Sequence, residues 1–185
     1  MSVHFDVSKI RFFGLDDWSV AVCAWRGCCI EVFSKAEHSV ADCLRTLASA
    51  GAPLGKDALN PFAGNRLKAL RICIADQGFG GHGEAALKRI AEWERVYEVR
   101  AHLAHGELKA TPHGISVSHR TFDGKTETRH PAKEYTRLEM LELLLDIEAA
   151  QKSLHDQLGQ IKALARKNKK PDPDARPAPG KATPG

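Results

Sequence analysis

The chain has 185 residues, of which 43% are hydrophobic and 27% are charged. This length suits one domain better than two, and the composition excludes collagen, wholesale disorder and a disulfide scaffold. The net charge of +4 comes from the end of the chain, because residues 162–185 carry seven Lys or Arg and two Asp, and the rest has a net charge of −1. A folded surface coated with Lys and Arg is therefore not indicated.

The first half of the chain shows the periodicity of helices. Apolar residues recur at steps of three and four over residues 17–50, which predicts one long helix. A loop over residues 51–64 follows, then a short helix over 65–77 and a glycine-rich break over 78–83. A third helix is predicted over 84–105, with Gly106 placed where a helix-ending glycine is expected.

The pattern changes after this glycine. Residues 107–131 alternate between polar and apolar side chains and contain the turn dipeptides His113-Gly114 and Asp123-Gly124, which predicts two or three short antiparallel strands. Thr136 and Glu139 form a capping box that opens a last helix. The sequence therefore predicts a mainly α protein: one domain over residues 1–168, with about four helices and a β-insertion before the last one. A disordered, basic, proline-rich tail is predicted over 169–185.

Several classes of protein and site are disfavoured by the sequence. No apolar run reaches the ~18–20 residues of a membrane span, and the N-terminal residues do not resemble a secretory signal. The five cysteines contain no C-x-x-C pair, so we expect reduced, mostly buried thiols rather than disulfides or a zinc site. We therefore expect a cytoplasmic protein with no membrane contact, no metal and no cofactor.

Two further motifs are weak. Residues 78–83 match G-x-G-x-x-G before a helix, as in dinucleotide-binding proteins, but the two preceding residues are polar and the segment fits a helix. A flexible loop is the favoured interpretation. His113, His119 and His130 lie around the predicted hairpin at a spacing that matches no standard metal set, so solvated histidines are favoured over ligands.

The clearest chemical pattern lies at the end of the third helix, where Arg100, His102 and His105 precede Gly106. Arg100 and His105 are about 140° apart around the helix axis and roughly 7.5 Å apart along it. One copy therefore makes a poor compact site, whereas two copies about a two-fold axis would bring two Arg and two His into one cleft. Imidazoles beside fixed cations suit acid–base catalysis without a metal.

The segment Val-Arg-Ala-His-Leu-Ala-His-Gly over residues 99–106 resembles the R-x4-6-H motif of the HEPN superfamily, and the order of elements over residues 16–165 is similar to its bacterial members. The resemblance implies a helical bundle that forms a homodimer through the motif helices. It implies a metal-independent endoribonuclease in a toxin–antitoxin or phage-defence setting, with an RNA substrate and a cognate antitoxin or regulatory protein as partners. His105 would then handle the protons of the ribose 2′-OH and the leaving 5′-oxygen, and Arg100 would stabilise the phosphorane.

One position departs from the family pattern. Ala101 stands where active members usually carry a polar residue directly after the arginine. His102 follows one position later and either takes that role as a third catalytic residue or is solvated. Because some members are noncatalytic, a helical interaction module in a larger complex is the alternative function, and the apolar stripe of residues 18–47 motivates it.

A structural role for both motif residues also stays open. Arg100 would then pair with a glutamate that is near in sequence, at position 94, 98 or 107. His105 would bind the C-terminal end of its helix, where a cation is favourable.

Overall fold

The computed structural model of the chain describes residues 17–124 and 126–168. Within them lie four α-helices: α1 (Asp17–Ser49), α2 (Ala63–Gln77), α3 (Gly81–His105) and α4 (Arg137–Lys167). A short 3-10 helix, η2, covers Lys56–Leu59. Between α3 and α4 lie the strands β1 (Glu107–Thr111), β2 (Gly114–Asp123) and β3 (Thr126–Thr136), which form an antiparallel sheet in the order β1-β2-β3. The predicted fold class, mainly helical with a small sheet before the last helix, is confirmed.

The β-insertion is longer than the sequence predicted. β3 continues past Pro131 to Thr136, because Tyr135 and Thr136 pair with the start of β2. Pro131 lies where the register between β2 and β3 shifts, and an irregular position on an edge strand tolerates a residue without an N–H donor. The capping box at Thr136 is present, with Glu139 N donating to Thr136 Oγ1 and Thr136 N donating to Glu139 Oε2. The predicted tail lies outside the described residues.

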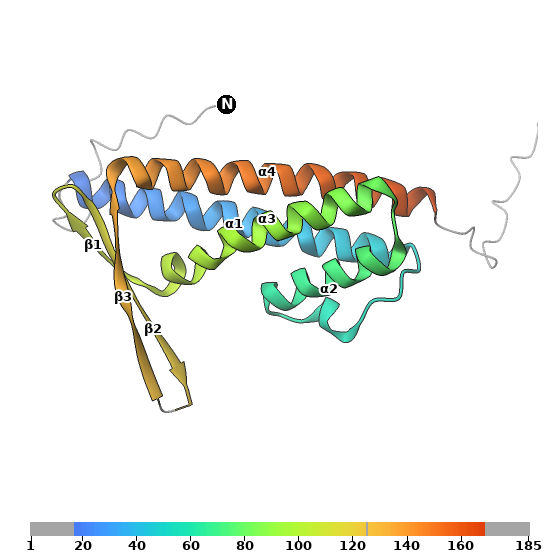
Figure 1. Cartoon of the computed structure of the whole chain (residues 1–185), viewed down its shortest axis with the longest axis horizontal. Helices are drawn as coiled ribbons and strands as arrows, with labels where there is room; N and C mark the ends of the chain where they lie inside the picture. Colours follow the sequence, from blue (N-terminus) through green and yellow to red (C-terminus); the bar gives the residue numbers. More distant parts are fainter. Residues whose placement is uncertain (1–16, 125, 169–185) are drawn as a thin grey trace, which may run out of the picture.

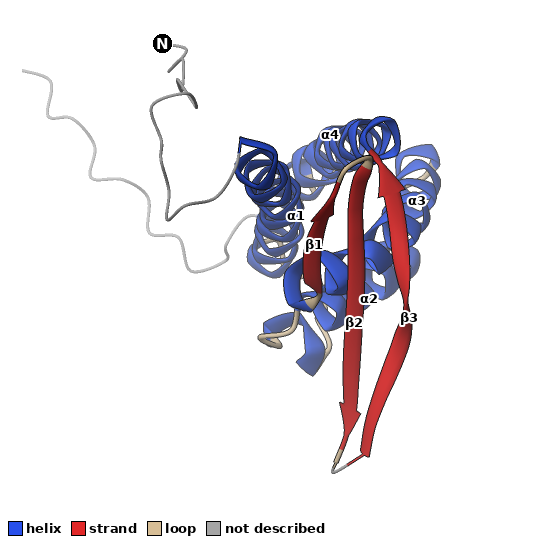
Figure 2. Cartoon of the chain, turned by 90° about the vertical axis from the view of Figure 1, so that its left-hand side faces the viewer, coloured by secondary structure: helices blue, strands red, loops and turns tan. Residues whose placement is uncertain are grey.

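The helices form an elongated bundle with the sheet at one end. α1 and α4 run side by side in the same direction, and α3 lies along both in the opposite direction (Figure 1). α2 packs on α1 and α3 at the end away from the sheet, and the β2–β3 hairpin extends well beyond the helices (Figure 2). Among the helices of the described residues, none is both long enough and apolar enough to cross a bilayer.

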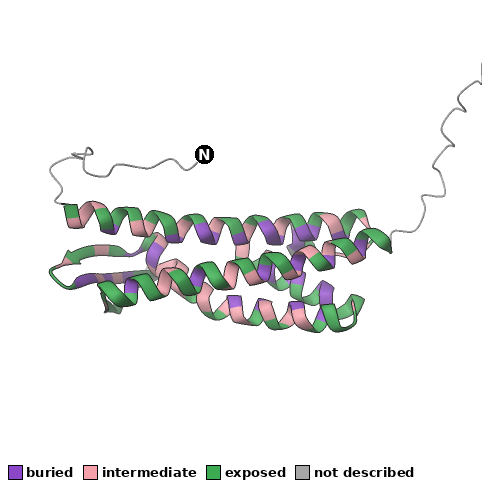
Figure 3. Cartoon of the chain, turned by 90° about the horizontal axis from the view of Figure 1, so that it is seen from above, coloured by how far each residue is buried: buried purple, intermediate pink, exposed green. Residues whose placement is uncertain are grey.

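The core lies between the helices, where their buried faces meet (Figure 3). Phe33, Trp93 and Tyr97 pack there in tilted and edge-to-face pairs, with ring centroids 5.6–6.2 Å apart. The apolar stripe predicted for α1 is buried in this core, including Val32, Ala36, Val40, Cys43 and Leu47. Its burial explains the stripe as packing within the chain rather than as a docking surface for another protein.

All five cysteines are free thiols, three of them buried and two exposed. Burial raises the pKa of Cys29 and of Cys43 to about 12. These two thiols therefore stay protonated and unreactive at neutral pH, as the sequence predicted for buried cysteines.

A smaller buried cluster joins the sheet to the bundle and consists of Val22, Ile115, Val117 and Met140. Two tryptophans of α1 fix this joint, because Trp25 Nε1 donates to Met140 O at 2.8 Å and Trp18 Nε1 donates to Thr111 O at 2.9 Å. The sheet is thus attached to the first turns of α1 and α4. As a result, β2 passes directly beside the end of α3, where the predicted site residues lie.

Candidate active site

The last turn of α3 is held by an arginine from another helix. Arg26 of α1 donates from Nε to Leu103 O at 2.6 Å and from Nη2 to Ala104 O at 3.0 Å. Carbonyls in the last turn of a helix lack partners within the helix, and a cation there also opposes the negative end of the helix dipole. Arg26 therefore takes the capping role that the structural alternative assigned to His105.

Gly106 follows with an extended backbone, at φ −74° and ψ 152°, rather than the left-handed conformation common for a glycine that ends a helix. A Cβ at this position would lie 2.2 Å from His102 O and 2.9 Å from Ser118 O. The glycine is thus required because both the last turn of α3 and the neighbouring β2 leave no room for a Cβ. This close packing brings β2 beside the histidines of α3.

Arg100 faces α1. Its Nε lies 2.6 Å from Glu37 Oε1, and the hydroxyl of Tyr97 donates to the same oxygen at 3.1 Å. The side chains of Arg100 and Glu37 are 32% and 19% exposed, and the guanidinium lies 5.5 Å from the centre of the Tyr97 ring. Burial, and next the Glu37 carboxylate, raise the pKa of Tyr97, so its phenol is a neutral donor.

The partner of Arg100 therefore differs from the glutamates near it in sequence. Glu94 pairs with Arg71 of α2, and Glu107 Oε1 lies 3.6 Å from Lys109 Nζ. The pairing with Glu37 is a contact between helices that sequence spacing does not show.

His105 lies on the other side of the same turn. Its exposed side chain lines an open hollow of about 670 Å³, together with Glu107, Ser118, His119 and Arg120. Arg100 is not among the residues around this hollow, so the two motif residues do not form one site in a single chain, as the helix geometry predicted.

Four histidines gather beside this hollow: His102 and His105 from α3, His119 from β2 and His130 from β3. We call them the histidine cluster. The ring centroids of His102 and His119 are 4.9 Å apart, and those of His119 and His130, which are cross-strand partners, are 5.5 Å apart. On its outer side, His130 Nε2 lies 2.9 Å from the Thr121 hydroxyl.

His119 is the central ring of the cluster and is only 9% exposed. Its pKa lies below the usual value of 6.5, first because burial disfavours the charged form and then because His102, His130 and His105 would repel it. The expectation of a solvated strand histidine is therefore wrong for His119. The expectation of solvation holds for His130, which is exposed on β3, and for His113, which is exposed in the turn between β1 and β2.

His102 is partly buried against His119 rather than solvated. Its Nδ1 atom is buried and has no hydrogen-bond partner among the described residues. Buried polar atoms are normally paired, so this unpaired imidazole nitrogen next to a second imidazole marks the region as a candidate site.

Sequence reasoning did not identify Arg26 or Glu37, which shape this region, and it wrongly interpreted His119 as solvated. For His119 a signal existed, because Ile115, Val117 and His119 alternate along β2 and all three are buried. No comparable signal marked Arg26 or Glu37, because each acts through a contact with α3, 60 or more residues away in the chain.

The weaker sequence motifs are resolved by the fold. α2, a helix, directly precedes the glycine-rich segment, and Gly78 ends it with a left-handed backbone at φ 59°. A dinucleotide site requires a strand before this motif, so the motif does not form one here. The predicted break over residues 78–83 is too long, because α3 already begins at Gly81. Within residues 17–124 and 126–168, no group of three or more His, Cys, Asp or Glu could hold a metal ion.

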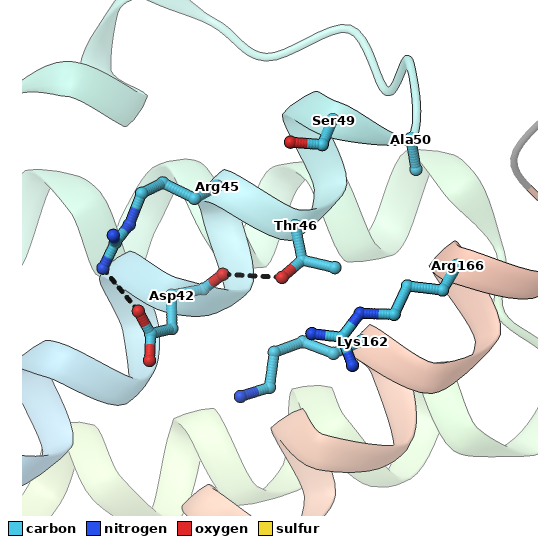
Figure 4. Close-up of a pocket in the computed structure, with 7 residues that line it drawn as sticks. All are labelled: Asp42, Arg45, Thr46, Ser49, Ala50, Lys162 and Arg166. Carbon is cyan, nitrogen blue, oxygen red and sulfur yellow. Dashed lines mark hydrogen bonds and ion pairs between the residues drawn. The ribbon is translucent and has the colours of Figure 1, made fainter. Parts of the chain in front are cut away.

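A second hollow, of about 420 Å³, lies between the C-terminal ends of α1 and α4, far from the histidine cluster. Figure 4 shows Lys162 and Arg166 extending from α4 toward α1, where Arg45 pairs with Asp42. Three cations face one carboxylate here. We call it the basic hollow.

No protein-family model, no curated protein and no solved structure matches this chain. Its function is therefore argued from the residues and their geometry.

Proposed function

We propose that the protein is a metal-independent endoribonuclease of HEPN type that acts as a homodimer, with a site built from His105 of one protomer and Arg100 of the other. The observation that carries the proposal is the end of α3: an exposed imidazole on an open hollow, on a helix turn fixed by Arg26. Arg100 sits on another side of the same helix, so a second copy is needed to combine the two groups.

The two side chains suit cleavage of RNA by its own 2′-hydroxyl. An imidazole accepts and donates the protons of the 2′-oxygen and of the leaving 5′-oxygen, which yields a 2′,3′-cyclic phosphate and a 5′-hydroxyl. Glu37 and Tyr97 hold Arg100 in one orientation. A guanidinium has five N–H donors, so those turned away from Glu37 can bind the phosphorane oxygens.

The setting belongs to the same proposal. A nuclease that attacks the RNA of its own cell needs restraint, so we place the protein in a cytoplasmic toxin–antitoxin or phage-defence system, with an antitoxin or regulatory protein as partner. His102 is the third residue of the proposed site. Because its ring packs on His119, it positions other groups rather than replacing the polar residue absent at Ala101.

The first experiment compares purified wild type, His105→Ala and His113→Ala on a structured RNA in excess EDTA. Loss of an acid–base group costs at least ~100-fold in rate. We expect that loss in His105→Ala, and none in His113→Ala, which removes an exposed imidazole elsewhere. Equal rates for His105→Ala and wild type would overturn the proposal.

The shared site is tested by mixing two inactive variants. In a two-fold dimer, a heterodimer of Arg100→Ala and His105→Ala contains one intact site and one doubly defective site. Random exchange of subunits should therefore restore about a quarter of wild-type activity. If both residues acted within one protomer, the mixture would stay as inactive as its components.

The basic hollow is expected to add attraction for RNA without taking part in the chemistry. Replacing both Lys162 and Arg166 by Ala should weaken RNA binding more at low salt than at high salt, since each phosphate contact on a single strand contributes about 0.7 to the salt slope. The cleavage rate at saturating RNA should not change.

The second candidate function is a noncatalytic helical module. Two observations favour it: Ala101 departs from the active pattern, and Arg100 already has a partner in Glu37. Leu138, Leu141 and Leu145 on α4 are each more than half exposed and offer a contact surface. A wild type that cleaves no RNA but forms a stoichiometric complex that Leu141→Glu abolishes would support this function. RNA cleavage abolished by Arg100→Ala would exclude it as the whole function.

A further inference from the structure

The hollow beside α3 contains two imidazoles of the same chain. His105 reaches it from the end of α3, and His119 reaches it from β2. They come from different elements and are exposed to different degrees: His105 is exposed, and His119 lies at the edge of the core. One chain thus places a hydrated imidazole and a desolvated one around a space large enough for a nucleotide.

This difference in environment separates the roles of the two rings. Burial among His102, His105 and His130 lowers the pKa of His119, which keeps its ring neutral at pH 7. A neutral imidazole is a base, and the exposed ring of His105 is then left for the second proton transfer. Pairs of titratable groups with such contrasting environments mark acid and base assignments.

We propose, resting on the ribonuclease proposal, that His119 is the general base and His105 the general acid of the RNA-cleaving site, and that both come from the same protomer. His119 accepts the proton of the ribose 2′-hydroxyl while the 2′-oxygen forms a bond to phosphorus. The bond between phosphorus and the 5′-oxygen breaks, and His105 donates its proton to that oxygen. One proton enters the histidine pair and one leaves it, and hydrolysis of the cyclic phosphate reverses the two roles.

The other residues around the hollow fit a phosphodiester. Ser118 offers a hydroxyl and Arg120 offers an exposed guanidinium. Arg120 Nη1 lies 3.3 Å from Glu127 Oε1. Glu107 is the only carboxylate among the lining residues of this hollow, and Lys109 lies 3.6 Å from it. Arg100 of the partner protomer then completes the charge stabilisation.

Two histidines position His119 rather than touch the substrate. His102 packs against the His119 ring at a tilt and His130 stacks on it, and neither lines the hollow. A matched control therefore has to lie outside the cluster, and His113→Gln removes an exposed imidazole from the turn between β1 and β2.

The experiment measures cleavage rates from pH 5 to 9 for wild type, His119→Gln, His105→Gln and the control His113→Gln in EDTA. A required base gives a rate that rises with pH, and a required acid gives a rate that falls at high pH. We expect His119→Gln to lose at least ~100-fold and the rising limb, and His105→Gln to lose the falling limb. His113→Gln should keep both limbs and the wild-type rate.

Circular dichroism melting separates catalysis from folding. If His119→Gln melts like wild type, its rate loss and missing limb support the general base. If it unfolds, His119→Asn and the pH profile of the folded fraction decide the question. A folded His119 variant with near-wild-type rate and an intact rising limb would overturn the inference, while loss in His105→Gln would still leave the ribonuclease proposal standing.

Binding of uridine 3′-monophosphate, followed by the imidazole resonances, tests the hollow apart from turnover. Shifts of both His105 and His119, with none at His113, support the two-histidine site. Absence of any shift would overturn it. Cleavage-inactive wild type would overturn the ribonuclease proposal and the catalytic role, whatever binds in the hollow.

Discussion

The titratable groups on the two sides of the last turns of α3 are arranged differently. On the side of α1, Arg100 and Glu37 form a 2.6 Å ion pair that Tyr97 supports with a second donor. On the side of the sheet, four histidines share one region, and a buried nitrogen of His102 has no partner among the described residues. The first arrangement pairs opposite charges and stabilises the fold. The second packs titratable imidazole rings against one another.

The contrast has a physical origin in the neighbouring elements. α1 is a rigid helix that places carboxylates and guanidiniums at fixed points along α3, so opposite charges pair. The sheet contributes alternating residues, and the side of β2 that must be buried carries His119 after two apolar residues. Burying an imidazole between imidazoles has no packing advantage over a third apolar residue, which is why this side is the candidate for chemistry.

The largest expected effect comes from breaking the packing that both sides share. Leu103 is fully buried in the last turn of α3, so Leu103→Ala should lower the free energy of unfolding by about 2–5 kcal/mol. Chemical denaturation measures the change. Leu138→Ala, at an exposed site on α4, should stay within about 0.5 kcal/mol of wild type, and a similar loss in both variants would contradict this account.

Removing the cap of α3 should have the next largest effect. Arg26→Met keeps the aliphatic stem but leaves the carbonyls of Leu103 and Ala104 without their charged donor, at a cost of about 1.5–3 kcal/mol. Thermal melting with circular dichroism measures it. Arg45→Met, which removes an exposed arginine from the same helix, serves as the control and should change stability little.

The ion pair on the α1 side should contribute less. Glu37→Gln removes the charge that faces Arg100, and because the pair is only partly exposed we expect a loss of about 1–2 kcal/mol, between exposed and buried pairs. Glu31→Gln breaks an exposed pair with Lys35 and is the matched control. Equal stability of the two variants in urea titrations would show that the Arg100 pair is no stronger than a surface pair.

The smallest effect concerns pH and the sheet side. Folding lowers the pKa of His119, so the unfolded chain binds a proton more readily than the folded chain. The free energy of unfolding is therefore unaffected by this group above about pH 6.5 and decreases as the pH falls below that value. His119→Gln should lose this part of the pH dependence, and His113→Gln should keep it. Unfolding free energies measured between pH 5 and 8 provide the test, and identical slopes for His119→Gln and wild type would contradict it.

Much of the fold followed from local signals. Apolar spacing predicted the long α1, and the capping box predicted the start of α4, because both depend on residues within a few positions of each other. The end of the β-insertion was predicted too early at Pro131, since the register shift that accommodates a proline depends on the partner strand. The contact of Gly106 with β2 likewise lies outside sequence spacing, because an added Cβ would meet Ser118 O as well as His102 O.

By itself the sequence determined the helices and the antiparallel insertion, since these follow from helical and strand periodicity. The same periodicity placed Arg100 and His105 on different faces of one helix. Only the tertiary structure decided that Glu37 holds Arg100, that Arg26 caps α3 and that His119 joins His102 and His105. Such contacts join residues far apart in the chain, and their energies depend on burial and distance, which one-dimensional spacing does not contain.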